Sequence, residues 1–131
     1  KVFVDLIQQS KPNTYMIMLS HAMYPQIDPD YPSSLSKKII TDWLRKDMGY
    51  KGVVVTDDMD MGALAKHYTF GDMAVQSIQA GSDILLVCHE YEHMQAAYNG
   101  LMKAVKDGTI SKERLDASVK RILLMKLSHG I

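Results

Sequence analysis

Gly52-Val53-Val54-Val55 runs directly into Thr56-Asp57-Asp58-Met59-Asp60-Met61, so a short apolar segment is followed at once by a cluster of carboxylates. Three consecutive valines are typical of a strand buried on both faces, as in a parallel sheet covered by helices. The acidic cluster then falls at the carboxyl end of that strand, where open α/β sheets and β/α barrels place their chemistry. The segment therefore predicts an α/β fold and a candidate site together.

Two further apolar segments extend the pattern, one before the valine strand at Tyr15–Leu19 and one after it at Asp83–Cys88. The strands would begin near residues 15, 52 and 83, and this spacing suits right-handed crossovers in a parallel sheet. Helical periodicity and stop signals predict the intervening helices. They are expected at residues 2–9, from a Ser36 cap to Gly49, around 62–65, from 70 to Gly81, from 94 to Gly108, and after a Ser111 cap, the last with Leu115, Val119, Ile122 and Leu123 on its inner face.

Three strands are too few to close a barrel, and an open three-stranded parallel sheet would leave two apolar edges unpaired. Further strands in a longer protein, or a second copy of this chain, would have to cover those edges. The chain also begins inside an amphipathic helix, without an initiator Met or a signal peptide. We therefore expect it to have been cut from something longer.

Composition narrows the function classes. The 131 residues, 47% hydrophobic and 23% charged, have the balance of one globular domain. Fifteen basic residues cancel fifteen acidic ones, which gives no reason to expect nucleic acid or an anionic membrane as partner. No apolar run approaches the roughly 20 residues that span a bilayer. The lone Cys88 excludes an internal disulfide and offers no cysteine-based metal site.

The residues at the strand ends are the candidates for chemistry. Asp57 and Asp58 point in different directions in extended backbone, so each would have its own task. A carboxylate in this place serves as nucleophile or base, as metal ligand, or as helix cap, and capping with solvation explains the pair equally well. His21 ends the first strand at the position equivalent to Asp57, so it would either bind substrate in the same cleft or bond to its own loop.

The other histidines and the methionines receive no chemical role from their spacing. His67, His89, His93 and His129 form no pair with ligand spacing on a shared apolar face. Most of the ten methionines fall at positions expected to face the core, where Met fills gaps. Within the acidic loop, Met59 and Met61 are the two that would line a pocket, although Met61 equally well starts the next helix. A Gly-rich phosphate loop is absent from the sequence.

Taken together, these segments resemble the family 3 glycoside hydrolases, and within them the β-N-acetylglucosaminidase branch. The resemblance is collinear over nearly the whole chain. It is carried by Ile17–Ala22 with Tyr24-Pro25 and Asp28, by Pro32–Ser36, Leu44-Arg45 and Gly49–Val54, by Thr56–Ala63 ("SDDLxMxAI" in the branch), by Ala80–Leu86, and by Arg114–Leu123.

The resemblance implies a (β/α)8 TIM-type barrel, of which residues 1–131 would be the carboxyl-terminal part, a partial N-terminal-type catalytic domain of about three βα units. It implies retaining hydrolysis of terminal β-linked N-acetylglucosamine from glycans such as peptidoglycan or chitin fragments, with Asp57 as nucleophile. We expect His21, Asp58 and Met61 to bind the substrate. The resemblance implies neither a metal nor an organic cofactor, and the single cysteine favours the bacterial cytoplasm over the envelope or the exterior.

The branch takes its general acid from a "KHFPGHGDT" loop, upstream of everything present here, and this sequence has no such motif. We therefore expect weak or no hydrolysis by this segment alone. Two other classes remain open. A receiver-like signalling domain also places acidic residues at strand ends in alternating βα units, although its acidic pair should follow the first strand. A non-catalytic half-barrel would instead serve assembly, as a homodimer that pairs its open sheet edges.

Overall fold

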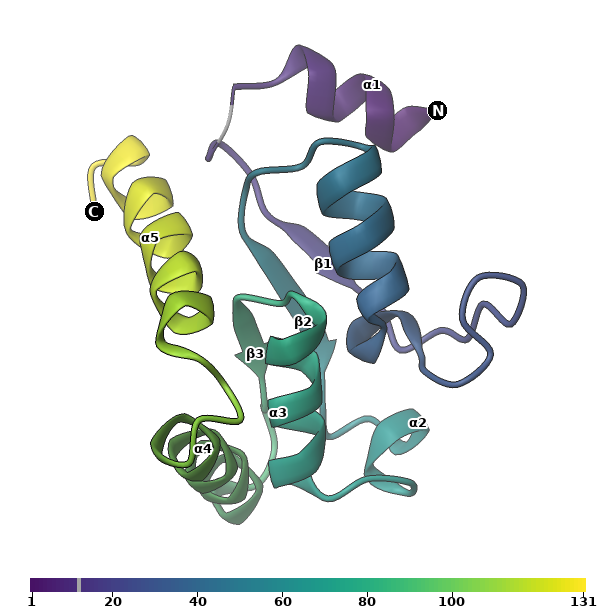
Figure 1. Cartoon of the computed structure of the whole chain (residues 1–131), viewed down its shortest axis with the longest axis vertical. Helices are drawn as coiled ribbons and strands as arrows, with labels where there is room; N and C mark the ends of the chain where they lie inside the picture. Colours follow the sequence, from purple (N-terminus) through teal and green to yellow (C-terminus); the bar gives the residue numbers. More distant parts are fainter. Residues whose placement is uncertain (12) are drawn as a thin grey trace.

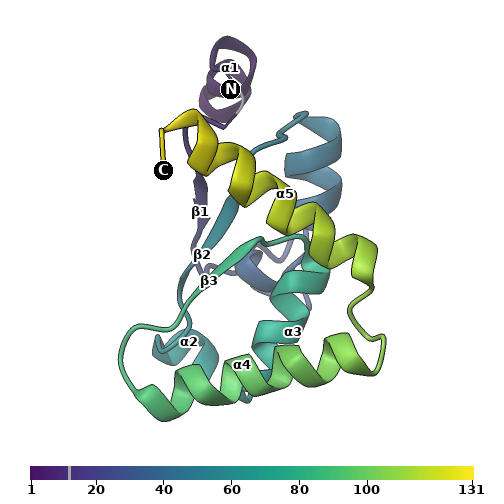
Figure 2. The same ribbon diagram turned by 90° about the vertical axis from the view of Figure 1, so that its left-hand side faces the viewer.

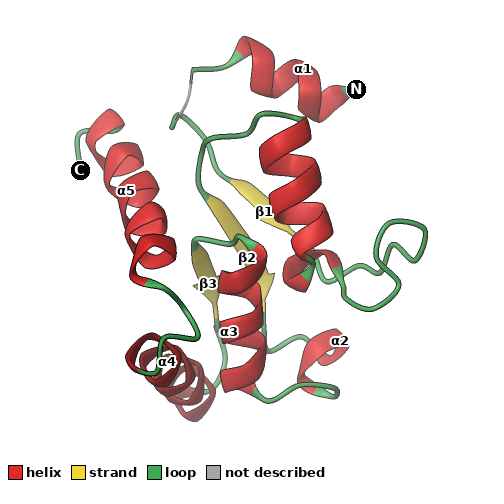
Figure 3. Ribbon diagram, viewed as in Figure 1, coloured by secondary structure: helices red, strands yellow, loops and turns green. Residues whose placement is uncertain are grey.

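A three-stranded parallel sheet lies at the centre of the computed structural model, which describes residues 1–11 and 13–131 (Figures 1 and 3). Its strands are β1 (Ile17–Leu19), β2 (Val54–Asp58) and β3 (Ile84–Leu86), in that spatial order. Ile17 pairs with Val54, and Val55 pairs with Ile84. The predicted α/β class and the parallel sheet are confirmed.

The central strand is the one that the valines predicted. Val53, Val54, Val55 and Thr56 are all buried, as expected for a strand with neighbours on both sides and helices over it. The strand continues through Asp58, so the first two acidic residues belong to its carboxyl end and do not lie in a loop.

The helices follow the predicted order (Figure 1). Ser111 Oγ accepts a hydrogen bond from Arg114 N–H at 3.1 Å, and Gly49, Gly81 and Gly108 end their helices with positive φ. These caps are confirmed. The elements are α1 (Val2–Gln9), the 3-10 turn η1 (Ser33–Leu35), η2 (Lys38–Asp47), α2 (Gly62–Ala65), α3 (Phe70–Ala80), α4 (Tyr91–Lys106) and α5 (Lys112–Ser128). Among the described residues, none of these helices combines the length and apolar character needed to cross a bilayer.

The helix after Ser36 differs from its prediction. Ser36 Oγ accepts a bond from Ile39 N–H at 3.1 Å, so the predicted cap is present. The helix that follows is a π-helix, in which bonds span five residues, as from Met48 N–H to the Trp43 carbonyl at 2.9 Å. Ile39, Ile40 and Leu44 of this helix are buried, whereas Trp43 is exposed.

The core lies between the sheet and the layer formed by η2 and α3, which cover one face (Figure 1). One cluster joins Ile17 and Val54 of the sheet to Ile40 and Leu44 of η2. A second is built from Leu35, Met59, Leu64 and Met73, near the carboxyl end of β2. Fully buried apolar side chains therefore anchor the acidic segment, through Met59, to the core.

The prediction that the apolar face of α5 packs inward is wrong for the described part of this chain. Val119 is 44% exposed and Leu123 is 53% exposed, and Leu115 is also exposed. Figure 2 shows α5, α4 and β3 around one side of the molecule. Side chains of these elements line an open apolar groove of about 360 Å³. The periodicity identified an apolar face correctly, but no described part of residues 1–131 covers it.

The methionine side chains are also more exposed than expected. Core packing was the expectation for most of them, but six of the ten are exposed. Only part of the set, such as Met59 and Met73, is fully buried. The exposed ones lie on β1, in loops and on α4, at positions Met16, Met18, Met23, Met61, Met94 and Met102. The two edge strands lack outer neighbours, so side chains on them and on α4 that were expected to be covered face solvent.

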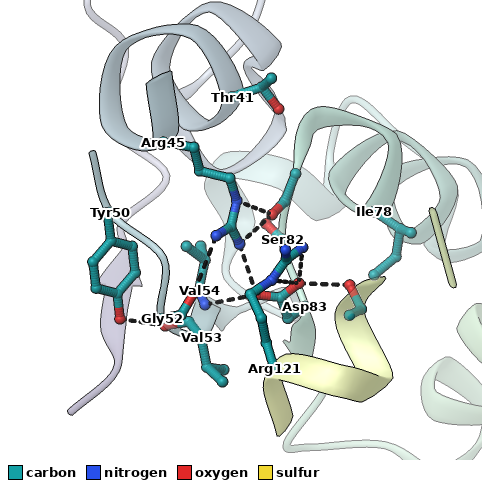
Figure 4. Close-up of polar contacts among 12 residues, drawn as sticks. Thr41, Arg45, Tyr50, Gly52, Val53, Val54, Ile78, Ser82, Asp83 and Arg121 are labelled. Carbon is teal, nitrogen blue, oxygen red and sulfur yellow. Dashed lines mark hydrogen bonds and ion pairs between the residues drawn. The ribbon is translucent and has the colours of Figure 1, made fainter. Parts of the chain in front are cut away.

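At the amino end of the strands, the buried carboxylate of Asp83 joins three elements (Figure 4). Arg45 of η2 contacts it at 2.6 Å and Arg121 of α5 at 3.0 Å. Ser118 Oγ and the backbone N–H of Val54 donate to it at 2.5 and 3.0 Å. Its side chain has no exposed surface, so a hydrogen-bonded ion cluster sits in the interior with every carboxylate oxygen partnered.

Helices α3 and α4 approach each other most closely at a pair of glycines. A Cβ placed on Gly100 would lie 2.6 Å from Gly71 Cα and 3.0 Å from its carbonyl oxygen. A Cβ on Gly71 would meet its nearest neighbours at 3.6 Å, which is an ordinary contact. The crossing therefore requires glycine at one of the two positions.

We expect Asp83→Asn to lower the free energy of unfolding by about 3 to 5 kcal/mol, because it leaves the half-buried guanidinium groups of Arg45, Arg114 and Arg121 without their buried counter-charge. Asp42→Asn is the matched control, since Asp42 makes only exposed contacts with lysines. Chemical denaturation of the three proteins measures the difference. Equal loss in both variants would mean that the cluster adds nothing specific.

The contribution of Asp83 to the free energy of unfolding should also depend on pH. Burial raises the pKa of this carboxyl, but Arg121, Arg45, Ser118 and the Val54 N–H outweigh burial and hold its pKa below the ordinary value. A carboxyl whose pKa is lower in the folded state stabilises fully above its unfolded-state pKa, near ~3.9, and loses this contribution below it. The stability gap between the wild type and Asp83→Asn should be constant at neutral pH and shrink below about pH 4.

Gly100→Ala should destabilise the fold by about 1 to 3 kcal/mol, because its new methyl group meets backbone that cannot move aside. Gly71→Ala should be neutral or slightly stabilising, since it gains helix propensity without a clash. Thermal unfolding followed by circular dichroism compares the two. A larger loss in Gly71→Ala than in Gly100→Ala would contradict the close crossing of α3 and α4 at these glycines.

Candidate functional site

The carboxyl ends of the three strands bring the predicted residues together. His21 follows β1, Asp57 and Asp58 end β2, and Cys88 and His89 follow β3. Asp58 pairs with Leu86 in the sheet register, so the acidic pair reaches as far as the end of β3. This edge is the end of a parallel sheet at which α/β proteins bind their ligands.

His21 is buried and both its ring nitrogens are engaged. Nε2 lies 2.9 Å from the backbone carbonyl of Asp58, and Nδ1 lies 2.7 Å from Ser34 Oγ. A carbonyl only accepts, so Nε2 carries a hydrogen, and in neutral His21 the Ser34 hydroxyl donates to Nδ1. The imidazole thus ties the loop after β1 to the end of β2. Its predicted part in substrate binding stays a prediction.

Asp58 is held by backbone donors on one side and by a histidine on the other. Its Oδ1 accepts from the N–H groups of Asp60 and Cys88 at 3.1 and 3.0 Å, and its Oδ2 lies 2.7 Å from His89 Nδ1. Burial raises the pKa of this carboxyl, but the two backbone donors and His89 outweigh burial and hold its pKa below the ordinary value. Asp58 is therefore a carboxylate at neutral pH that joins the ends of β2 and β3.

Asp57 is less constrained. It is half-buried, and its Oδ1 accepts from the N–H of Asp58 at 2.9 Å. Across residues 1–11 and 13–131, its carboxylate makes no further hydrogen bond, which leaves Oδ2 available to a ligand. The preceding Thr56 is fully buried and accepts from Leu86 N–H, so the backbone that presents Asp57 is fixed.

The two methionines of the acidic segment differ from each other. Met59 is fully buried in the core beneath the site. Met61 is exposed and occupies the N-cap position of α2. Met61 can thus line a pocket above the strand ends, whereas Met59 cannot.

A second group of residues joins the site without having been predicted. The side chain of Asp60 accepts the N–H of His89 at 3.1 Å, and its other oxygen bonds to His93 Nδ1. The His93 ring stacks on Phe70, with centroids 4.0 Å apart. Ligand atoms of Asp58, Asp60 and His89 all lie within 4.8 Å of one another. No spacing along the chain pointed to this group, because Asp60 and His93 are 33 residues apart.

Comparison with known proteins places this arrangement in a family. The sequence profile of the "Glycosyl hydrolase family 3 N terminal domain" matches residues 1–125. An uncharacterized secreted glycosyl hydrolase from Arthroderma benhamiae is 41% identical over 108 residues, which cover 82% of this chain and 31% of that protein. A β-hexosaminidase from Pasteurella multocida is 39% identical over 90 residues, covering 69% of this chain and 25% of that protein.

A solved structure gives the same result. The family 3 β-N-acetylglucosaminidase from Paenibacillus sp. FPU-7 superposes with a TM-score of 0.89 at 41% identity, over 95% of this chain and 23% of that one. The chain thus spans about a quarter to a third of the length of the proteins it matches. On the family profile and on these relatives, the chain belongs to glycosyl hydrolase family 3, within its N-terminal domain.

Proposed function

We propose that the full-length protein hydrolyses terminal β-linked N-acetylglucosamine from glycans such as peptidoglycan or chitin fragments, with retention of configuration, and that Asp57 is the nucleophile. The observation that carries the proposal is the position of Asp57: it ends a buried strand, on a rigid backbone, with one carboxylate oxygen free. The substrate class rests on the names of relatives, a β-hexosaminidase and a β-N-acetylglucosaminidase.

In this proposal, Asp57 Oδ2 attacks the anomeric carbon and forms a glycosyl-enzyme, which water then hydrolyses. A second carboxyl or equivalent acid, roughly 5 Å away, protonates the leaving oxygen. Asp58 is unsuited to that task, because its neighbours stabilise the ionised form and hold its pKa low. The branch that this sequence resembles carries its acid on an upstream loop without a counterpart in residues 1–131, so in this proposal the segment alone is weakly active or inactive.

His21, Asp58 and Met61 support Asp57 in the proposed substrate site. His21 and Asp58 lie at the same strand ends and fix the loops that surround the nucleophile. Met61, at the N-cap position of α2, offers an exposed apolar surface against which a sugar ring or an acetamido methyl group can pack.

The chain is further proposed to be the carboxyl-terminal part of a (β/α)8 barrel, contributing about three of its βα units. Two apolar grooves support this idea, one beside β3 and one beside β1, since neighbouring strands and helices of a closed barrel would fill both. A receiver-like domain is not favoured, because the family 3 profile covers residues 1–125. Pairing of two copies through the open edges remains the alternative if the segment occurs alone.

We expect Asp57→Asn in the full-length protein to lower kcat for an aryl N-acetylglucosaminide by about 10³-fold or more, because an amide is a poor nucleophile. Asp42→Asn, on the outer surface of η2, controls for the loss of a charge. Unchanged turnover in Asp57→Asn would show that another residue attacks the sugar.

The covalent intermediate provides the direct measurement. A 5-fluoro N-acetylglucosaminyl donor with a good leaving group should label the peptide that contains Asp57 in the full-length protein, as read by mass spectrometry. Residues 1–131 alone should remain unlabelled, because the resemblance places most of the residues that hold the sugar upstream of this segment; the good leaving group makes the acid unnecessary for this step. Label on a different peptide would replace Asp57 as nucleophile, and rapid labelling of the segment would show that residues 1–131 bind the sugar without upstream residues.

A further inference from the structure

A mixed carboxylate and imidazole cluster lies beside the proposed nucleophile, at the carboxyl ends of β2 and β3. It consists of Asp58, Asp60, His89 and His93, drawn from the end of β2, the loop after it, the loop after β3 and the first turn of α4. We propose that this cluster binds a divalent transition metal of the Zn²⁺ type. The proposal rests on these four side chains and is independent of the glycosidase activity proposed above.

The spacing of the ligand atoms suits such an ion. His89 Nδ1 lies 2.7 Å from Asp58 Oδ2 and 3.9 Å from Asp60 Oδ2. Around a tetrahedral Zn²⁺ with bonds of about 2.0 to 2.2 Å, neighbouring ligand atoms are about 3.3 to 3.6 Å apart. A small rotation of the His89 side chain, which is 68% exposed, brings its nitrogen into this range.

Backbone donors orient the carboxylates and leave the inward oxygens for the ion. Asp58 Oδ1 is occupied by the N–H groups of Asp60 and Cys88, so Oδ2 is the oxygen that faces the cluster. Asp60 is nearly buried, and His93 Nδ1 holds its Oδ1, so Oδ2, which also accepts the N–H of His89, is the oxygen that faces His89 Nδ1. Such outer hydrogen bonds are what hold the ligands of protein metal sites in place.

The imidazole of His93 orients Asp60 and is not itself one of the three grouped ligands. It meets the Asp60 carboxylate through Nδ1, and stacking on Phe70 fixes the plane of its ring. A set of one imidazole and two carboxylates, with water in the fourth position, suits Zn²⁺, Co²⁺ or Ni²⁺, whereas Ca²⁺ and Mg²⁺ prefer oxygen ligands throughout. The exposed His89 gives the ion a route from solvent.

Electrostatics favours a cation at this point. The side chains of Asp58 and Asp60 are only 14% and 5% exposed, so water screens two neighbouring carboxylates poorly. Among the residues that the structure describes, no lysine or arginine forms an ion pair with either of them, and histidines are their only basic partners. A bound divalent metal would neutralise both carboxylates at once.

The experiment is a titration of the metal-free full-length protein with Zn²⁺ by isothermal calorimetry, and with Co²⁺ by visible absorption. We expect one ion per chain, with Co²⁺ bands typical of nitrogen and oxygen ligands. His89→Asn and His93→Asn should each weaken Zn²⁺ binding by about 10-fold or more. His67→Asn, which removes an exposed histidine outside the cluster, is the matched control and should bind as the wild type does.

Two further variants keep the result interpretable. Cys88→Ser should leave Zn²⁺ affinity unchanged, since the thiol is not in the ligand set, and Asp60→Asn should weaken binding while circular dichroism shows an intact fold. Absence of stoichiometric binding would mean that the cluster is a hydrogen-bond network only. Binding that survives in the His89→Asn/His93→Asn double variant would place the ion elsewhere. Either outcome overturns the proposal.

Discussion

The arrangement of this fragment of sheet and helices depends on one buried carboxylate, that of Asp83. It bonds to η2 through Arg45, to β2 through the Val54 N–H, and to α5 through Arg121 and Ser118. α5 is also held by Arg114, which donates to the carbonyls of Ile78 and Ser82, but Ser118 is its one buried residue among those described. A buried ion cluster is costly to desolvate, and it is tolerated here because hydrogen bonds satisfy each of its members.

The two ends of the sheet therefore carry different kinds of polar contact. At the amino end, guanidinium groups surround one carboxylate and set the positions of the helices. At the carboxyl end, side chains bond mainly to backbone: His21 to the Asp58 carbonyl, and Asp58 to the N–H groups of Asp60 and Cys88. These contacts fix the loops around Asp57 while leaving that residue one free oxygen. Separation of stability from chemistry in this way is what β/α folds allow.

Local signals in the sequence were sufficient for much of the fold. The valine segment specified the central strand, and Ser111, Gly81 and Gly108 specified helix ends, because cap and turn chemistry acts over a few residues. The exposed faces of α4 and α5 were not predictable, since periodicity reveals that a face is apolar but not whether this chain supplies its partner. The π-helix was missed because Ile39, Ile40 and Leu44 fit either helical period.

The site was predictable to a similar degree. The placement of Asp57, Asp58 and His21 at one edge followed from the parallel order of the strands. The engagement of both His21 nitrogens required knowledge of where Ser34 lies, 13 residues away. Asp60 and His93 meet across 33 residues, and His89 reaches Asp58 from the next βα unit, so no spacing along the chain signalled their cluster.

The sequence distances across the Asp83 cluster have a kinetic consequence. Asp83 and Arg45 are 38 residues apart, and so are Asp83 and Arg121. Each contact closes a long loop, whose entropy cost must be met before the contact contributes anything. The segments on both sides of Asp83 must be docked first, so we expect the cluster to complete late, after the folding barrier. The cluster then slows unfolding and has little effect on the rate of folding.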